Sequence, residues 1–270
     1  MKIMHFGLAG LAMLSSLAVA CPCRNPLDAT ADQYLAIDAA INAQYQQAGQ
    51  FAPPSPMPFP TIVNQSASFN VAVTPTNELH YLAVNKDAIT AALAGLGGNF
   101  TLPSSGIVAF EMRFDHFPRR AMSLSGDTIL YAFFGNASGY RFRVGLTDLN
   151  SGAFSYYGTE YNGVFTQGSL GASLAPVALP LPHNFRVGFY INMKTHRVGY
   201  TVNGVDHGYV ADPLPADVTD IALGIGADTY AKTGEKILGV PVGGTLITHA
   251  TQFTQPFPAG TRDLCGTPMP

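Results

Sequence analysis

The fold class is decided by one stretch of two segments, Phe185-Arg-Val-Gly-Phe-Tyr-Ile-Asn192 and Arg197-Val-Gly-Tyr-Thr-Val-Asn-Gly-Val205, which a four-residue turn joins. Apolar residues alternate with polar residues or glycine in both halves, which is typical of β-strands that bury one face. Asn203-Gly204 is a dipeptide favoured in type I′ turns between antiparallel strands. The stretch therefore predicts successive antiparallel hairpins.

Similar alternation extends along the chain on both sides of this stretch. We expect strands over residues 69–73, 79–82, 108–114, 129–134, 140–146, 153–157, 221–225 and 245–249. They follow one another without the regular intervening helices of a parallel sheet. The pattern predicts one all-β antiparallel sandwich over residues 61–270.

The region before the sandwich, residues 21–60, does not show the alternation of β-strands. Helical spacing over 28–48 predicts a short N-terminal helix with Thr30 or Asp28 as its cap. Five prolines then fall between residues 53 and 60. Because proline cannot donate to a sheet ladder, this stretch predicts an extended arm that covers the sandwich. A second helix is expected inside the sandwich over residues 87–96.

Composition limits the function classes. Only 11% of the 270 residues are charged and 47% are hydrophobic, whereas soluble proteins average about a quarter charged. This excludes a disordered, charge-rich chain. There are 14 Lys and Arg against 17 Asp and Glu, with no basic run, which excludes a general nucleic-acid binder.

Residues 1–20 have the pattern of a secretory signal peptide. Lys2 precedes an apolar run, and Ala18-Val-Ala20 is a small-x-small cleavage site. The apolar run is about 17 residues long, and a membrane-spanning helix needs about 20. We expect cleavage after Ala20, no transmembrane span, and a secreted or periplasmic protein.

Three cysteines remain after this cleavage: Cys21, Cys23 and Cys265. In an oxidising compartment two should pair and one is left over. The simplest pairing, Cys23 with Cys265, ties the ends of the chain together and leaves Cys21. The residues before Cys21 also fit the loose pattern read by lipoprotein signal peptidase. Two outcomes stay open: plain secretion, or an outer-membrane lipoprotein with lipid on Cys21.

Residues 184–208 resemble the paired strands of concanavalin-like jelly-roll domains. The blocks Leu27-Asp-Ala-Thr30, Leu102-Pro-Ser-Ser-Gly-Ile-Val-Ala-Phe-Glu111 and Phe257-Pro-Ala-Gly-Thr-Arg-Asp-Leu-Cys-Gly266 resemble those of a family of exported proteobacterial proteins catalogued as a domain of unknown function. The resemblance implies a concanavalin-like fold. Members of that family keep one Cys near the mature N-terminus and one in the final block, which supports the Cys23–Cys265 pairing. The family supplies no catalytic residues.

The non-core faces of the expected strands carry arginine and tyrosine among glycines. The candidate ligand-binding residues are Arg141, Arg143, Arg186, Tyr190 and Arg197. Glycine lets a ligand approach the backbone, and Arg and Tyr are suitable partners for sugars and carboxylates. This favours an envelope or secreted binding protein whose ligand is a glycan or another envelope polymer. Alternatively, the N-terminal helix and the Pro-rich arm cover this face.

The alternative function is a polysaccharide hydrolase on the same scaffold. A retaining glycosidase needs two carboxylates about 5–5.5 Å apart. No local spacing provides such a pair, so the candidates are Glu111 and Glu160, brought together from different strands, and no catalytic residue is assigned. No metal-ligand spacing is present, and no cofactor is expected. The alternative is calcium in the stretch that contains Asp212, Asp217, Asp220 and Asp228.

Overall fold

The computed structural model describes residues 23–36, 39, 59–73, 79–93, 98–116, 127–135, 141–149, 152–161, 164–169 and 185–270. The expected signal peptide, Cys21 and most of the Pro-rich stretch lie outside the described residues. Among the helices that are described, none has the length and apolar character needed to cross a membrane.

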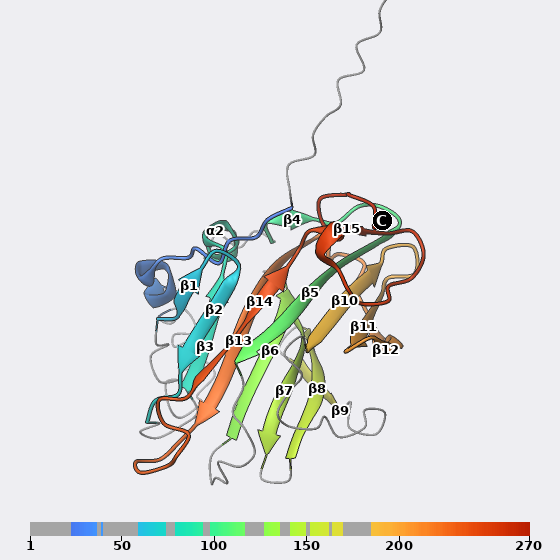
Figure 1. Ribbon diagram of the computed structural model, residues 1–270. Helices are drawn as coiled ribbons and strands as arrows, with labels where there is room; N and C mark the ends of the chain where they lie inside the picture. The colour runs from blue at the N-terminus through green and yellow to red at the C-terminus, as the bar shows by residue number, and fades with distance from the viewer. Residues whose placement is uncertain are drawn as a thin grey trace, which may run out of the picture.

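The described strands form two sheets (Figure 1). The first sheet has the order β1 (Thr61–Val63), β2 (Ser66–Asn70), β14 (Pro241–Ile247), β5 (Ile107–His116), β10 (Arg186–Asn192), β11 (Arg197–Val202) and β12 (Val205–Pro213), and β15 (Thr261–Asp263) also pairs with β5. The second sheet has the order β3 (Leu79–Val84), β13 (Asp220–Tyr230), β6 (Asp127–Gly135), β7 (Arg141–Leu149), β8 (Gly152–Tyr161) and β9 (Val164–Ser169), and β4 (Phe100–Thr101) also pairs with β13.

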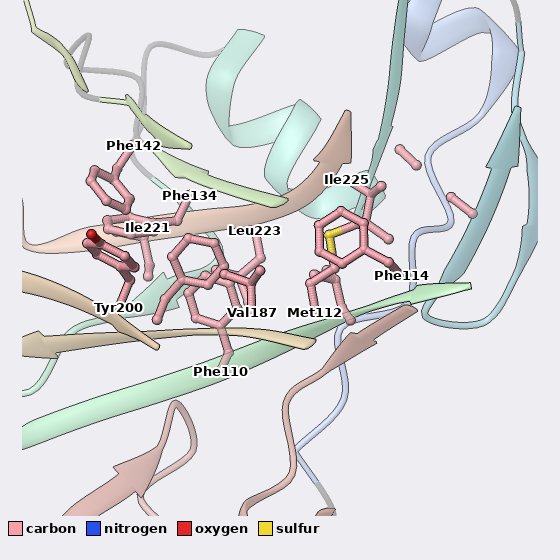
Figure 2. Packing of buried hydrophobic residues seen from close by; sticks show 14 of the residues in the cluster. Phe110, Met112, Phe114, Phe134, Phe142, Val187, Tyr200, Ile221, Leu223 and Ile225 are labelled. Atoms are coloured by element: carbon pink, nitrogen blue, oxygen red, sulfur yellow. The ribbon is translucent and has the colours of Figure 1, made fainter. Parts of the chain in front are cut away.

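The core lies between these two sheets. Figure 2 shows side chains from both sheets meeting there: Phe110, Met112, Val187 and Tyr200 from the first, and Phe134, Phe142, Ile221, Leu223 and Ile225 from the second. Phe134 meets Phe110 edge to face, with ring centroids 6.0 Å apart. Phe142 meets Phe189 in the same way at 6.1 Å. Aromatic pairs with this geometry stabilise a core beyond the area they bury, and they fix how the sheets face each other.

The expected all-β antiparallel sandwich is confirmed. Strand β10 pairs antiparallel with β11, and Val187 lies opposite Val202. Asn203 and Gly204 both have positive φ, 45° and 88°, as a type I′ turn requires. One departure from the antiparallel pattern was not predicted: the short strand β15 pairs parallel to β5.

The N-terminal segment closes one end of the sandwich. Leu27 is fully buried in the core, and its N–H donates to the carbonyl of Asn64 at 2.7 Å. The following helix begins after Thr30, as expected. The Thr30 hydroxyl accepts from the Gln33 N–H at 3.3 Å, and the Gln33 side chain accepts from the Thr30 N–H at 2.9 Å. This reciprocal pair is a capping box.

Two further elements fix this end. The second expected helix is present as α2 (Lys86–Leu93), and Asn85 caps it by accepting from the Asp87 N–H at 2.8 Å. A disulfide joins Cys23 to Cys265, which agrees with the pairing favoured from the sequence. Because Cys265 lies two residues beyond the end of β15, this bond attaches the first described residue close to the last strand.

Candidate functional site

The five residues predicted to bind a ligand do not lie on one surface. Arg141 and Arg143 belong to β7 in the second sheet, whereas Arg186, Tyr190 and Arg197 belong to β10 and β11 in the first. In each strand these residues alternate with core residues, so they lie on the outer faces of the two sheets. Those faces point to opposite sides of the sandwich. The two faces are therefore separate candidate surfaces.

The outer face of the first sheet is organised around a buried carboxylate. The side chain of Glu111 on β5 is completely buried. Its Oε1 accepts from the backbone N–H of Thr254 at 2.7 Å and of Gln255 at 2.8 Å. Its Oε2 accepts from Nη1 of Arg186 at 2.9 Å, and Arg186 also donates to the carbonyl of Gln252 at 3.0 Å. Glu111 is thus a structural anchor with its hydrogen-bonding capacity largely used.

The segment that Glu111 holds is residues 248–260, which we call the C-terminal strap. It leaves the sheet after β14 and returns to it as β15. Its Gln255 is buried and accepts from the Gly204 N–H at 2.9 Å, which ties the strap to the hairpin turn. The carboxylate of Asp263, also fully buried, accepts from the Ala250 N–H at 3.2 Å and from the Cys265 N–H at 3.0 Å. Together we call the strap and the sheet surface beneath it the strap face.

Glycines on the strap face make room for the protein's own aromatic rings. A Cβ atom added at Gly188 would lie 2.6 Å from the ring of Phe257, which belongs to the strap. One added at Gly199 would lie 2.2 Å from the ring of Tyr190. Tyr190 itself is only 1% exposed. The space that the sequence suggested for a ligand is occupied by side chains at both positions.

Two further polar groups of the strap face, Tyr190 and Arg197, also have partners. The Tyr190 hydroxyl donates to Asp206 at 2.9 Å, and burial, with this hydrogen bond and charge as the smaller cause, raises the pKa of Tyr190. The Arg197 guanidinium lies over the ring of Tyr209, 5.0 Å from its centroid, and donates to the Val210 carbonyl at 3.1 Å. Arg186, Tyr190 and Arg197 thus contact other parts of the same chain.

The strap was not predicted from the sequence. Glu111 occupies an outward position of an expected strand, where a charged residue ordinarily faces water. The available signal was the run Phe253-Thr-Gln-Pro-Phe-Pro258 after the last expected strand. Its aromatic residues favour burial against the sandwich, and its prolines exclude a further central strand. The cover expected from the sequence was the N-terminal helix with the Pro-rich arm, but Tyr34 of that helix packs against Leu82 and Val84 of β3 in the second sheet.

The outer face of the second sheet brings a different set of residues together. Here the structure describes the backbone register. Phe134 on β6 lies opposite Phe142 on β7, and both are core residues. The alternate positions of these strands and of β8 therefore belong to the outer face. They hold Tyr131, Phe133, Arg141, Arg143, Gly145, Tyr156, Gly158 and Glu160, and we call this set the arginine face.

Register fixes which of these positions are neighbours. Arg141 lies opposite Glu160, and Arg143 lies opposite Phe133 on one side and Gly158 on the other. Gly145 lies between Tyr131 and Tyr156. Directly opposed residues of antiparallel strands have Cβ atoms about 4.5–5.5 Å apart. Arginine, glutamate, tyrosine and phenylalanine are thereby concentrated at the centre of one sheet face.

The carboxylates proposed for hydrolysis are not brought together. Glu111 belongs to the first sheet and is enclosed beneath the strap, whereas Glu160 belongs to the second sheet. Their strands present them on opposite sides of the sandwich. The pairing of Glu111 with Glu160 as flanking catalytic groups is therefore wrong.

The aspartates considered for calcium are also separated. Asp220 and Asp228 are eight residues apart on strand β13, or about 26 Å at the usual rise. Asp217 lies just before this strand, and the side chain of Asp212 is outside the described part of the structure. Within the described residues, the metal-ligating side chains that converge are Cys23, Asp263 and Cys265. The sulfur atoms of Cys23 and Cys265 are bonded to each other in the disulfide.

Comparison with known proteins gives a family match over part of the chain. Residues 181–267 match the family described as a domain of unknown function, DUF4882. This segment contains β10 to β15 and the strap. No curated protein matches the sequence.

Solved structures with a similar arrangement are distant in sequence. A structure titled native glycosidic hydrolase is 10% identical, with a TM-score of 0.37, over 70% of this chain and 78% of that chain. Bacillus licheniformis β-glucanase is 9% identical, with a TM-score of 0.34, over 70% and 80%. A legume lectin-like domain from Entamoeba histolytica is 9% identical, with a TM-score of 0.38, over 69% and 84%.

Proposed function

We propose that this protein binds a glycan through the arginine face of its second sheet. The observation that carries the proposal is the register of β6, β7 and β8, which gathers Arg141, Arg143 and Glu160 with three aromatic residues on one non-core face. On the opposite side of the sandwich, Arg186 and Tyr190 contact the protein's own chain. The arginine face is thus the better candidate of the two.

The residue types on this face suit a sugar. Aromatic rings offer flat apolar surfaces with a polar group at the edge of tyrosine, which match the C–H face of a pyranose ring and its hydroxyls. Arginine and glutamate supply several donors and acceptors in fixed geometry. Gly145 and Gly158, which alternate with these residues, add no side-chain bulk, so that a polymer can lie close to the sheet.

Binding without hydrolysis is the simpler conclusion. Acid–base cleavage of a glycosidic bond needs two carboxyl groups on the same substrate. The register of the arginine face provides Glu160, and the second candidate, Glu111, belongs to the other face. A binding site needs only a shaped surface with a few polar anchors.

The test is a glycan array run beside a reducing-sugar release assay. We expect binding without sugar release, with binding weakened in Tyr156→Ala and Arg141→Ala. The matched control is Lys194→Ala, an exposed residue in the turn between β10 and β11, which should bind as wild type does. Sugar release that Glu160→Gln abolishes would establish the hydrolase instead. Unchanged binding in both face variants would reject the arginine face as the site.

We also propose that the protein is exported and loses residues 1–20. The support is the signal-peptide pattern and the disulfide between Cys23 and Cys265, since disulfides persist mainly in oxidising compartments. Intact-mass measurement of the protein from its native host separates the two forms. A mature chain without additions indicates secretion or a periplasmic location, and an added diacylglyceryl and acyl mass on Cys21 indicates an outer-membrane lipoprotein. Retention of residues 1–20 would contradict both.

A further inference from the structure

We propose that the glycan is acidic, and that Arg143 binds an anionic group, a carboxylate or a sulfate, on its sugar units. This inference rests on the proposed function of the arginine face and specifies its ligand. The observation behind it is that the register leaves Arg143 without an acidic residue at either opposed position.

The two arginines of β7 have different neighbours. Arg141 lies directly opposite Glu160, and opposite charges at such positions attract each other. Arg143 lies opposite Phe133 and Gly158. Arg141 thus has an acidic residue directly opposite it in the sheet, and Arg143 has none at its two cross-strand positions.

Among the register neighbours of these two arginines, Glu160 is the one carboxylate: it lies directly opposite Arg141 and diagonally, at about 7–8 Å, from Arg143. The next acidic residue of the sheet is farther away. Phe133, opposite Arg143, pairs on its other side with Gly224 of β13. Asp228 of the same strand is four positions beyond Gly224, about 13 Å along the strand at the usual rise. Two arginines thus share one carboxylate among their register neighbours. The register therefore leaves an excess of positive charge at the centre of this face, although the chain as a whole has a net charge of −3.

The chemistry of arginine indicates what would balance this charge. Its planar guanidinium forms paired hydrogen bonds with a carboxylate, and its geometry suits other planar or tetrahedral oxyanions in the same way. Arg141 and Arg143 are two residues apart on one strand, about 7 Å along its axis. A polymer running along β7 could thus place an anionic group at Arg143 and a neighbouring hydroxyl group near Arg141 and Glu160. Phe133 and Tyr131 on β6 and Tyr156 on β8 would supply the surface for its rings.

The experiment compares three polymers with the full-length mature protein. Polygalacturonate carries carboxylates, κ-carrageenan carries sulfates, and laminarin is neutral. We expect tighter binding to one or both anionic polymers than to laminarin, with an affinity that falls as salt rises. Arg143→Gln should weaken this binding at least about tenfold, and Arg143→Lys should retain part of it because the charge remains. Arg262→Gln, an exposed arginine on β15, is the matched control and should bind as wild type does.

The outcomes separate this inference from the proposed function. Preference for polygalacturonate identifies a carboxylate, and preference for κ-carrageenan identifies a sulfate. Binding to laminarin that is as tight as to the anionic polymers and unaffected by Arg143→Gln would overturn the acidic ligand and leave the glycan-binding function intact. Failure to bind any of the three polymers or any sugar on the array would reject the function and this inference with it.

Discussion

The two outer faces of the sandwich use arginine and glutamate in different ways. On the strap face, Glu111 and Arg186 form an ion pair at 2.9 Å, and the carboxylate also holds two backbone N–H groups of the strap. On the arginine face, the register opposes one glutamate to Arg141 and leaves Arg143 opposite a glycine and a phenylalanine. The strap covers the first face. On the second sheet, the N-terminal helix and α2 cover the outer side of β3, and the arginine face on β6 to β8 is where we propose that a glycan binds.

Glycine shows the same contrast. Gly188 and Gly199 lie under the rings of Phe257 and Tyr190, where a Cβ atom would collide. Gly158 lies opposite Arg143. On the strap face the glycines serve internal packing, and on the arginine face we propose that Gly158 serves ligand access. The residue that covers it, and not the glycine itself, distinguishes the two uses.

The largest expected effect is a difference in the free energy of unfolding between variants of the two glutamates. Glu111→Ala leaves Arg186 and two backbone N–H groups without their acceptor beneath the strap. Breaking a buried ion pair in this way costs about 3–5 kcal/mol, to be measured by urea unfolding. Glu160→Ala on the arginine face is the counterpart, and we expect it to cost less than about 1 kcal/mol while weakening glycan binding. Equal losses of stability in the two variants would remove the distinction between the faces.

A smaller effect is expected from the glycines. Gly199→Ala should cost about 1–3 kcal/mol, because the new methyl group overlaps the Tyr190 ring. The cost of the same change should shrink in a Tyr190→Leu background, where the ring is absent. Gly158→Ala should change stability by less than about 0.5 kcal/mol and instead reduce the affinity for glycan. A cost at Gly199 that is the same in both backgrounds would show that the ring is not its cause.

The smallest expected effect is a pH dependence of the unfolding free energy, caused by a histidine in the sheet that carries the strap face. His207 on β12 stacks on Tyr200, with ring centroids 5.1 Å apart, and burial lowers the pKa of His207, although the nearby Asp206 opposes this. The unfolded chain, with a histidine pKa of about 6.5, therefore takes up a proton before the folded state does. Stability should be fully present above about pH 6.5 and should fall as the pH drops through the lowered pKa.

The control for this prediction is Lys194→Ala, an exposed residue in the turn between β10 and β11, measured beside His207→Gln. Only the change at His207 should flatten the fall in unfolding free energy as the pH drops below about 6.5. An identical pH profile in wild type and His207→Gln would contradict the assignment.

The local alternation of residues was sufficient to predict the fold class. The spacing of Val187, Phe189 and Ile191 and the Asn203-Gly204 turn gave the β10–β11 pair and the turn that follows it correctly. These features depend on neighbours in the chain, where sequence patterns are informative. The Thr30 cap was predictable for the same reason.

Sheet membership was not predictable from the same patterns. Arg143 and Arg186 both alternate with core residues, so their local sequences do not reveal that they lie on opposite sides of the molecule. Nor does an outward glutamate show whether it meets water or a covering segment. Glu111 is more than 140 residues away in the chain from Thr254 and Gln255, the strap residues that it binds, and their contact follows from the topology of the whole chain.

The disulfide between Cys23 and Cys265 has a mechanical consequence. Tension applied to the chain ahead of Cys23 and beyond Cys265 passes through one covalent bond between them. The two sheets lie outside this load path, so pulling on the ends cannot peel strands away one after another as it would in the reduced protein. A protein attached to a surface by one end and to a partner by the other would transmit force without unfolding until the disulfide was cleaved.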